Sequence, residues 1–262
     1  MRTAVWMAVA VFVCSAMALG QDQNTESDWN DFLHYTMIGR FDLAKGFGDR
    51  LLASAPDPLL LLDLSEANPN GYNILLKMQA DSDQLRETAG GILAIIEEGR
   101  YMRRTDPRII LAEIERLNTT IRGKISAQER LKNAGEYAIP FLLEVLGDPG
   151  RREEYANVVQ TLPMIGRPAI RPLAASLQMD SVAVKAEIIK ALGAIGYFQS
   201  LPYLKYVVEQ DGSSDLQKAA QEALDRIDSQ TGRLPAGELF YMLAEKYYNE
   251  DDSVAPASDF SF

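Results

Sequence analysis

Apolar residues in the second half of the chain recur at spacings of three and four, which predicts amphipathic helices. Three segments that begin at Ala138, Ala169 and Ser200 start 31 residues apart and carry apolar residues at the same relative positions. The aligned positions are Ile139, Ile170 and Leu201, then Leu142, Leu173 and Leu204, then Leu146, Leu177 and Val208. A second apolar segment precedes each of these, with aligned residues at Leu131, Leu162 and Leu192 and a fourth at Leu224. Each repeat is therefore predicted to be a pair of amphipathic helices.

Turn-forming residues separate the predicted helices. Gly135, Gly166 and Gly196 stand where a helix end needs a left-handed residue, a conformation that glycine adopts freely. Ser126 and Glu129 have the spacing of a capping box, which predicts that the first repeat begins at Ser126. A single helical hairpin cannot bury its apolar stripe alone, so neighbouring hairpins are expected to stack around a continuous core.

The segment Ser126–Asp228 resembles the HEAT repeat family, in particular a short bacterial form named after bilin lyases. The best match is VKAEIIKALGAIG, over Val184–Gly196, in which Lys185 replaces the family's usual arginine; AIPFLLEVL, which starts at Ala138, resembles the second helix. The resemblance implies an all-α fold, a right-handed α-solenoid of stacked HEAT-like or armadillo-like hairpins with an additional N-terminal helical region. It also implies that the second helix of each pair lines a concave face that binds other proteins. The candidate contact residues on that face are Phe141, Glu144, Arg171, Tyr203, Lys205 and Tyr206.

The regions on either side of the repeats are also predicted to be helical. One early hairpin resembles a tetratricopeptide unit through Tyr35, Gly39, Phe41, Ala44, Leu51 and Pro56. NPNGYN at 68 and RRTDPR at 103 predict loops. AGELFYMLAEKYYNE, from 236, predicts a helix with aromatic residues on both sides, through which the chain could self-associate, and DDSVAPASDFSF predicts an acidic, poorly ordered tail. The predicted domains are a signal peptide at 1–20, an N-terminal helical region at 21–122, the repeat array at 123–232, and the C-terminal helix and tail at 233–262.

The first twenty residues have the form of a secretory signal peptide. Arg2 precedes an apolar run, and the small residues Ala18 and Gly20 suit a cleavage site before Gln21. An uncleaved membrane anchor is the alternative, but the apolar stretch Ala4–Leu19 is shorter than the roughly 20 residues that span a bilayer. We therefore expect an exported protein, periplasmic or secreted, in a bacterial cell envelope, with no membrane span after cleavage.

Charge and composition narrow the candidate partners and chemistry. Loss of Arg2 would change the formal net charge from −11 to −12, and so acidic a chain argues against nucleic acid or anionic lipid as the main partner. His34 is the only histidine, and Cys14, inside the predicted signal peptide, is the only cysteine. Neither a multi-histidine metal site nor a disulfide is expected, and no nucleophile-elbow or phosphate-loop motif occurs. We expect no catalytic residue, no cofactor and no metal site.

The function predicted from these observations is that of an exported, non-catalytic scaffold or adaptor that binds another protein through the concave face. An alternative is an enzyme-associated module of the bilin-lyase type that binds a tetrapyrrole or a similar ligand. A third is a purely structural role in envelope assembly, which would show as self-association.

Overall fold

The computed structural model describes residues 24–255, and all the regular secondary structure in this part of the chain is helical. The chain divides into two compact units that meet between Arg103 and Arg104, and each unit has its own buried core. The predicted signal peptide and residues 256–262 of the predicted tail lie outside the described residues. The expectation of an all-α protein is confirmed.

The N-terminal unit is a set of helices around an aromatic and aliphatic core. Its helices span residues 24–37, then α2 (Phe41–Ala53), α3 (Pro58–Ala67), α4 (Pro69–Asp81) and α5 (Arg86–Thr105). Trp29 and Phe32 from the first helix are fully buried among leucine and isoleucine side chains of the others. Burial of such large side chains is the main favourable contribution to the stability of this unit.

Both predicted loops in this region are helical instead. At 68–73, Asn68 alone separates α3 from α4, and its side-chain carbonyl accepts a hydrogen bond from the backbone N–H of Gly71 at 3.2 Å. At 103–108, Asp106 alone separates α5 from α6 (Pro107–Arg116), and its carboxylate accepts a hydrogen bond from the backbone N–H of Arg108 at 2.8 Å. Asparagine and aspartate are strong N-cap residues, so one residue is enough to end one helix and begin the next.

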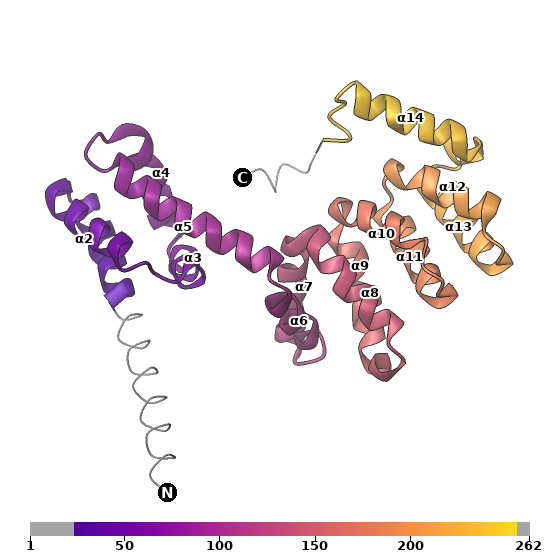
Figure 1. Ribbon diagram of the computed structural model, residues 1–262, viewed down its shortest axis with the longest axis horizontal. Helices are drawn as coiled ribbons and strands as arrows, with labels where there is room; N and C mark the ends of the chain where they lie inside the picture. Colours follow the sequence, from indigo (N-terminus) through magenta and orange to yellow (C-terminus); the bar gives the residue numbers. More distant parts are fainter. Residues whose placement is uncertain (1–23, 256–262) are drawn as a thin grey trace, which may run out of the picture. The chain divides into compact units, whose positions relative to one another are not determined.

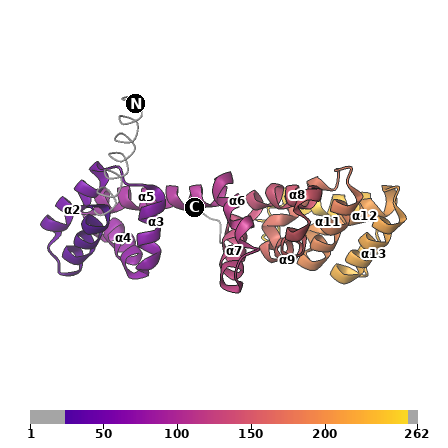
Figure 2. The same cartoon turned by 90° about the horizontal axis from the view of Figure 1, so that it is seen from below.

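The second unit is a series of helical pairs that follow one another in Figure 1. Its helices are α6 (Pro107–Arg116), α7 (Ile121–Ala134), α8 (Ile139–Gly147), α9 (Tyr155–Ile165), α10 (Ile170–Ser176), α11 (Val182–Ile195), α12 (Leu201–Gln210), α13 (Ser214–Asp228) and α14 (Ala236–Tyr248). The odd-numbered helices α7, α9, α11 and α13 pack on one another as one layer, and the even-numbered helices form the other. Figure 2 shows α6 and α8 on one side and α7 and α9 on the other. The unit is a solenoid, and it includes α6, which precedes the predicted array.

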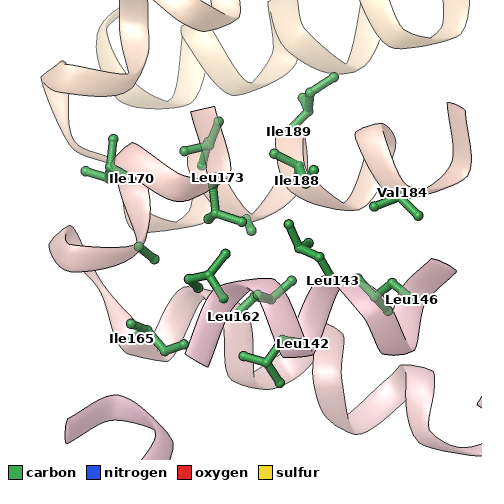
Figure 3. Packing of buried hydrophobic residues seen from close by; sticks show 14 of the residues in the cluster. Leu142, Leu143, Leu146, Leu162, Ile165, Ile170, Leu173, Val184, Ile188 and Ile189 are labelled. Atoms are coloured by element: carbon green, nitrogen blue, oxygen red, sulfur yellow. The ribbon is translucent and has the colours of Figure 1, made fainter. Parts of the chain in front are cut away.

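The predicted apolar positions of the repeats form the core of this unit. Figure 3 shows side chains from α8, α9, α10 and α11 meeting in one shared layer. Leu142, Leu173 and Leu204, which align in the sequence, are each fully buried. Val208 differs from its aligned partners: it is half-buried, and Val207 takes the buried position on α12.

The turn glycines are confirmed, whereas the predicted cap of the first repeat is wrong. Gly135, Gly166 and Gly196 all have positive φ, although only Gly196 is in the left-handed helical region. Helix α7 begins at residue 121, because the Thr120 hydroxyl accepts a hydrogen bond from the backbone N–H of Gly123 at 3.1 Å. Ser126 therefore lies inside a helix that an earlier residue already caps.

Candidate functional site

All six residues predicted to line the concave face lie on even-numbered helices. Phe141 and Glu144 are on α8, Arg171 is on α10, and Tyr203, Lys205 and Tyr206 are on α12.

Their exposure divides them into two groups. Phe141 and Tyr203 are half-buried and pack against the core, so much of each ring has a structural role. Lys205 is also half-buried, whereas Glu144 and Arg171 are exposed and Tyr206 keeps 48% of its surface. Of the six, Tyr206 is the exposed aromatic residue that another molecule would meet.

A groove of about 490 Å³ lies beside Tyr206, between α10 and α12. Its volume is within the range of small binding pockets. Apolar side chains of both helices line it together with polar groups at their C-terminal ends. The lining residues used below are Leu177, Gln178, Met179, Asp180, Tyr203, Tyr206, Val207 and Phe240. Of the six predicted residues, the groove brings together Tyr203 and Tyr206.

An ion pair closes one end of the groove. The Lys185 ammonium at the start of α11 donates to the Asp211 carboxylate at the end of α12 at 2.8 Å, and both side chains are mostly buried. The lysine, with help from the backbone N–H of Ser213, lowers the pKa of Asp211. The charge of this pair is therefore balanced, and the pair fixes the end of α12 to the start of α11 in the same repeat.

The C-terminal helix forms another wall of the groove. Helix α14 packs on α12 and continues the layer of even-numbered helices. The Phe240 ring meets the Tyr203 ring edge to face with centroids 5.1 Å apart, and the backbone N–H of Ala236 donates to Glu209 Oε1 at 3.1 Å. Buried Leu239 anchors the helix in the core. Sequence reasoning missed Phe240 as a groove residue; the aromatic residues on both sides of this helix were the available signal.

The segment after α14 returns to the turns of earlier repeats. The Tyr197 hydroxyl donates to the Ser253 carbonyl oxygen at 2.8 Å, Arg167 donates to the Ala255 carbonyl oxygen, and Val254 is buried. Asp251 accepts hydrogen bonds from Ser253 and Lys246, which lower its pKa to about 2. The prediction of a poorly ordered tail from residue 251 is therefore wrong for residues 251–255, which make these contacts.

A second concavity, of about 590 Å³, lies near the turn between α6 and α7. Three of its lining residues, Asn118, Lys124 and Asn157, are already engaged in hydrogen bonds. Lys124 Nζ donates to Asn157 Oδ1 at 2.7 Å and to Gln160 Oε1 at 2.8 Å, and Asn157 Nδ2 donates to Asn118 Oδ1 at 2.7 Å. Binding a ligand here would require breaking these hydrogen bonds, so we do not place the site here.

His34 is exposed on the first helix, and its ring contacts Tyr35 edge-on at 5.2 Å. Within residues 24–255, no group of three or more histidine, cysteine, aspartate or glutamate residues is placed to hold a metal ion. In the same range, every helix is too short or too polar to cross a bilayer.

The stacked pairs define a helical-repeat protein, the class whose long shared surfaces serve recognition. Residues 132–225 match the family model for HEAT repeats. This range runs from the end of α7 through most of α13, so it includes α10 and α12 beside the groove. A search of curated proteins finds no match to the chain. HEAT repeats commonly mediate protein interactions, and the bilin-lyase and tetratricopeptide likenesses stay predictions.

Proposed function

We propose that this protein is an exported, non-catalytic scaffold that binds another protein through the face formed by α8, α10 and α12. The observation that carries the proposal is the groove beside half-exposed Tyr206, between α10 and α12. A face of packed helices keeps its shape in the absence of a partner, so little ordering entropy opposes binding. A specific partner would cover about 800 Å² of such a surface.

The side chains on this face suit protein recognition better than catalysis. Tyrosine and arginine are enriched at the centres of protein interfaces, and both are present here as Tyr206 and Arg171. A hydrolytic or transfer mechanism needs a nucleophile, a base and a group that stabilises charge within reach of one another. The groove instead presents amides, tyrosine rings and a carboxylate, with its one lysine held in an ion pair.

Site-specific photo-cross-linking in the protein's own cell tests this proposal. A photoreactive phenylalanine analogue in place of Tyr206 should give a cross-link to a distinct second protein. The same analogue in place of Lys190, exposed on α11 in the other layer, is the control. Equal cross-linking from both positions, or none from Tyr206, would contradict binding through this face.

Export is part of the proposal, and the apolar stretch Ala4–Leu19 supports it. Intact-mass measurement of the protein recovered from the cell envelope gives a direct test. Cleavage should leave Gln21 as the first residue. A protein that still begins at Met1 and fractionates with membranes would favour the anchor instead.

A further inference from the structure

We infer that the groove between α10, α12 and α14 takes a large apolar side chain of a partner segment that carries a lysine or arginine next to it. This inference rests on the proposed protein-binding function and specifies the chemistry of the partner. The surface concerned, called the Phe240 groove below, is defined by Leu177, Gln178, Met179, Asp180, Tyr203, Tyr206, Val207 and Phe240.

An aromatic ring of the chain itself, that of Phe240, forms part of the wall of the Phe240 groove. Phe240 comes from α14, yet it packs edge to face on Tyr203 of α12 and leaves a volume of about 490 Å³ beside it. Leu177 and Val207 are buried in the floor, whereas Tyr206 and Met179 keep 48% and 38% of their surface at the rim. A second ring or long apolar side chain would meet the same kind of surface that Phe240 meets, and its burial would be favourable.

The charge around the Phe240 groove selects a basic neighbour for that side chain. Asp180 lines the groove, is exposed, and forms no ion pair within residues 24–255. The one basic lining residue, Lys185, is neutralised by Asp211. A lysine or arginine of the partner would therefore form an ion pair with the Asp180 carboxylate. The same cation would lie over the exposed Tyr206 ring in a cation–π contact.

The wider surface has the same sign at this end of the solenoid. From residue 206 to 255 the chain carries 11 acidic and 4 basic residues, whereas from 104 to 205 it carries 11 acidic and 14 basic ones. The acidic excess is thus confined to the end of the unit that contributes α12 and α14. Complementary charge speeds encounter with a basic segment and opposes an acidic one, including a second copy of this acidic end.

Four short peptides test the apolar side chain and the basic neighbour separately. Each has a glycine–serine frame with a central phenylalanine or alanine, flanked by two lysines or by two glutamates. We expect the phenylalanine–lysine peptide to bind the full-length protein at least about tenfold more tightly than each of the other three, in calorimetry at low salt. Equal binding of the lysine and glutamate forms, or no binding of any peptide, would overturn the inference.

Substitutions with matched controls place the binding in the Phe240 groove. Asp180→Lys should abolish the preference for lysine over glutamate, whereas Glu222→Lys, an equal charge change at an exposed position of α13, should preserve it. Tyr206→Ala should weaken binding of the phenylalanine–lysine peptide at least about fivefold. Tyr248→Ala removes a tyrosine that is 88% exposed on α14 and should leave binding unchanged. Equal effects of test and control variants would place the peptide elsewhere and overturn the inference.

Two further outcomes distinguish this inference from the proposed function. A cross-link from the Tyr206 position to another protein, combined with peptides that show no preference, would overturn the partner chemistry and leave the scaffold function standing. Sedimentation that shows a dimer broken by Tyr206→Ala would mean that a second copy covers the groove, and this would overturn the inference as well.

Discussion

Both units use glycine at close helix contacts and at turns, but within residues 24–255 only the solenoid repeats the turn glycine from one helical pair to the next. In the N-terminal unit, α5 approaches α3 so closely that a methyl group on Gly99 would lie 2.2 Å from the Pro58 carbonyl oxygen. In the solenoid, Gly166 has no atom within 4 Å of such a methyl group, but its backbone has φ 76° and ψ −145°. One glycine serves helix contact and the other serves a turn. The solenoid has a glycine with positive φ at three successive turns, Gly135, Gly166 and Gly196, whereas the N-terminal unit has one, Gly39.

Loss of core volume in the solenoid should give the largest effect. Leu173 is fully buried in the layer that successive repeats share (Figure 3). Leu173→Ala should lower the free energy of unfolding by about 2–5 kcal/mol, because the surrounding helices cannot collapse fully into the space. Hydrogen exchange with mass spectrometry would localise the loss.

The location of that loss tests whether the two units are independent. Exchange should rise across α8 to α13 and stay unchanged around Ile92 in the core of the N-terminal unit. Leu76→Ala, at a leucine that is 44% exposed on α4, should have little effect. A rise in exchange through both cores would mean that the two units unfold together.

A methyl group at Gly99 should give the next largest effect, confined to the N-terminal unit. Gly99→Ala would place carbon against a backbone oxygen that cannot rotate away, and overpacking of this kind costs about 2–3 kcal/mol. Gly46→Ala in α2 is the matched control, because no atom lies within 4 Å of the added methyl group. Alanine is the better helix former, so the control should stabilise by about 0.5–1 kcal/mol. Similar urea midpoints for the two variants would refute the close contact.

The turn glycine should give a smaller loss in the solenoid. Gly166→Ala keeps enough space but places a side chain in a backbone region that only glycine tolerates, at a cost of about 1–2 kcal/mol. Gly147→Ala, at the end of α8 where φ is negative and nothing lies within 4 Å, should be neutral or stabilising. If alanine at 166 were as stable as at 147, the repeat turns would not require positive φ.

The difference between the units also explains what the sequence could predict. Periodic apolar positions such as Leu142 and Leu173 identify the repeat helices, because each hairpin needs the same buried stripe. The turn glycines could be predicted from the sequence for the same reason. The N-cap of α7 could not be predicted, because Thr120 and Ser126 are both suitable N-cap residues. Which of them caps the helix depends on the residues that precede it.

The candidate site was predictable only in part. Tyr203 and Tyr206 follow from their place on a second helix, and the groove contains both. Phe240 could not be assigned, because its contact with Tyr203 depends on how α14 packs after the turn that follows α13. In the sequence, Asp180 is an ordinary turn residue. Its place in the groove could not be predicted, because it depends on how α12 and α14 pack beside the turn.

The smallest expected effect concerns charge at the end of the groove and depends on pH. Asp211→Asn keeps the hydrogen bond from the Ser213 backbone but removes the carboxylate that pairs with Lys185, and it should lower stability at pH 7 by about 0.5–1 kcal/mol. The pKa of Asp211 is lowered in the folded protein, so its contribution is complete above the ordinary carboxyl pKa of about 3.9 and is lost as the pH falls through the lower folded value. The free energies of unfolding of Asp211→Asn and the unsubstituted protein, measured in urea titrations, should therefore differ at neutral pH and converge as the pH falls below about 4.

The control is Asp252→Asn, at an exposed residue, which should have the stability of the unsubstituted protein. A difference between Asp211→Asn and the original protein that persists unchanged at low pH would show that the ion pair does not hold the repeat end, and that the amide itself disturbs the turn.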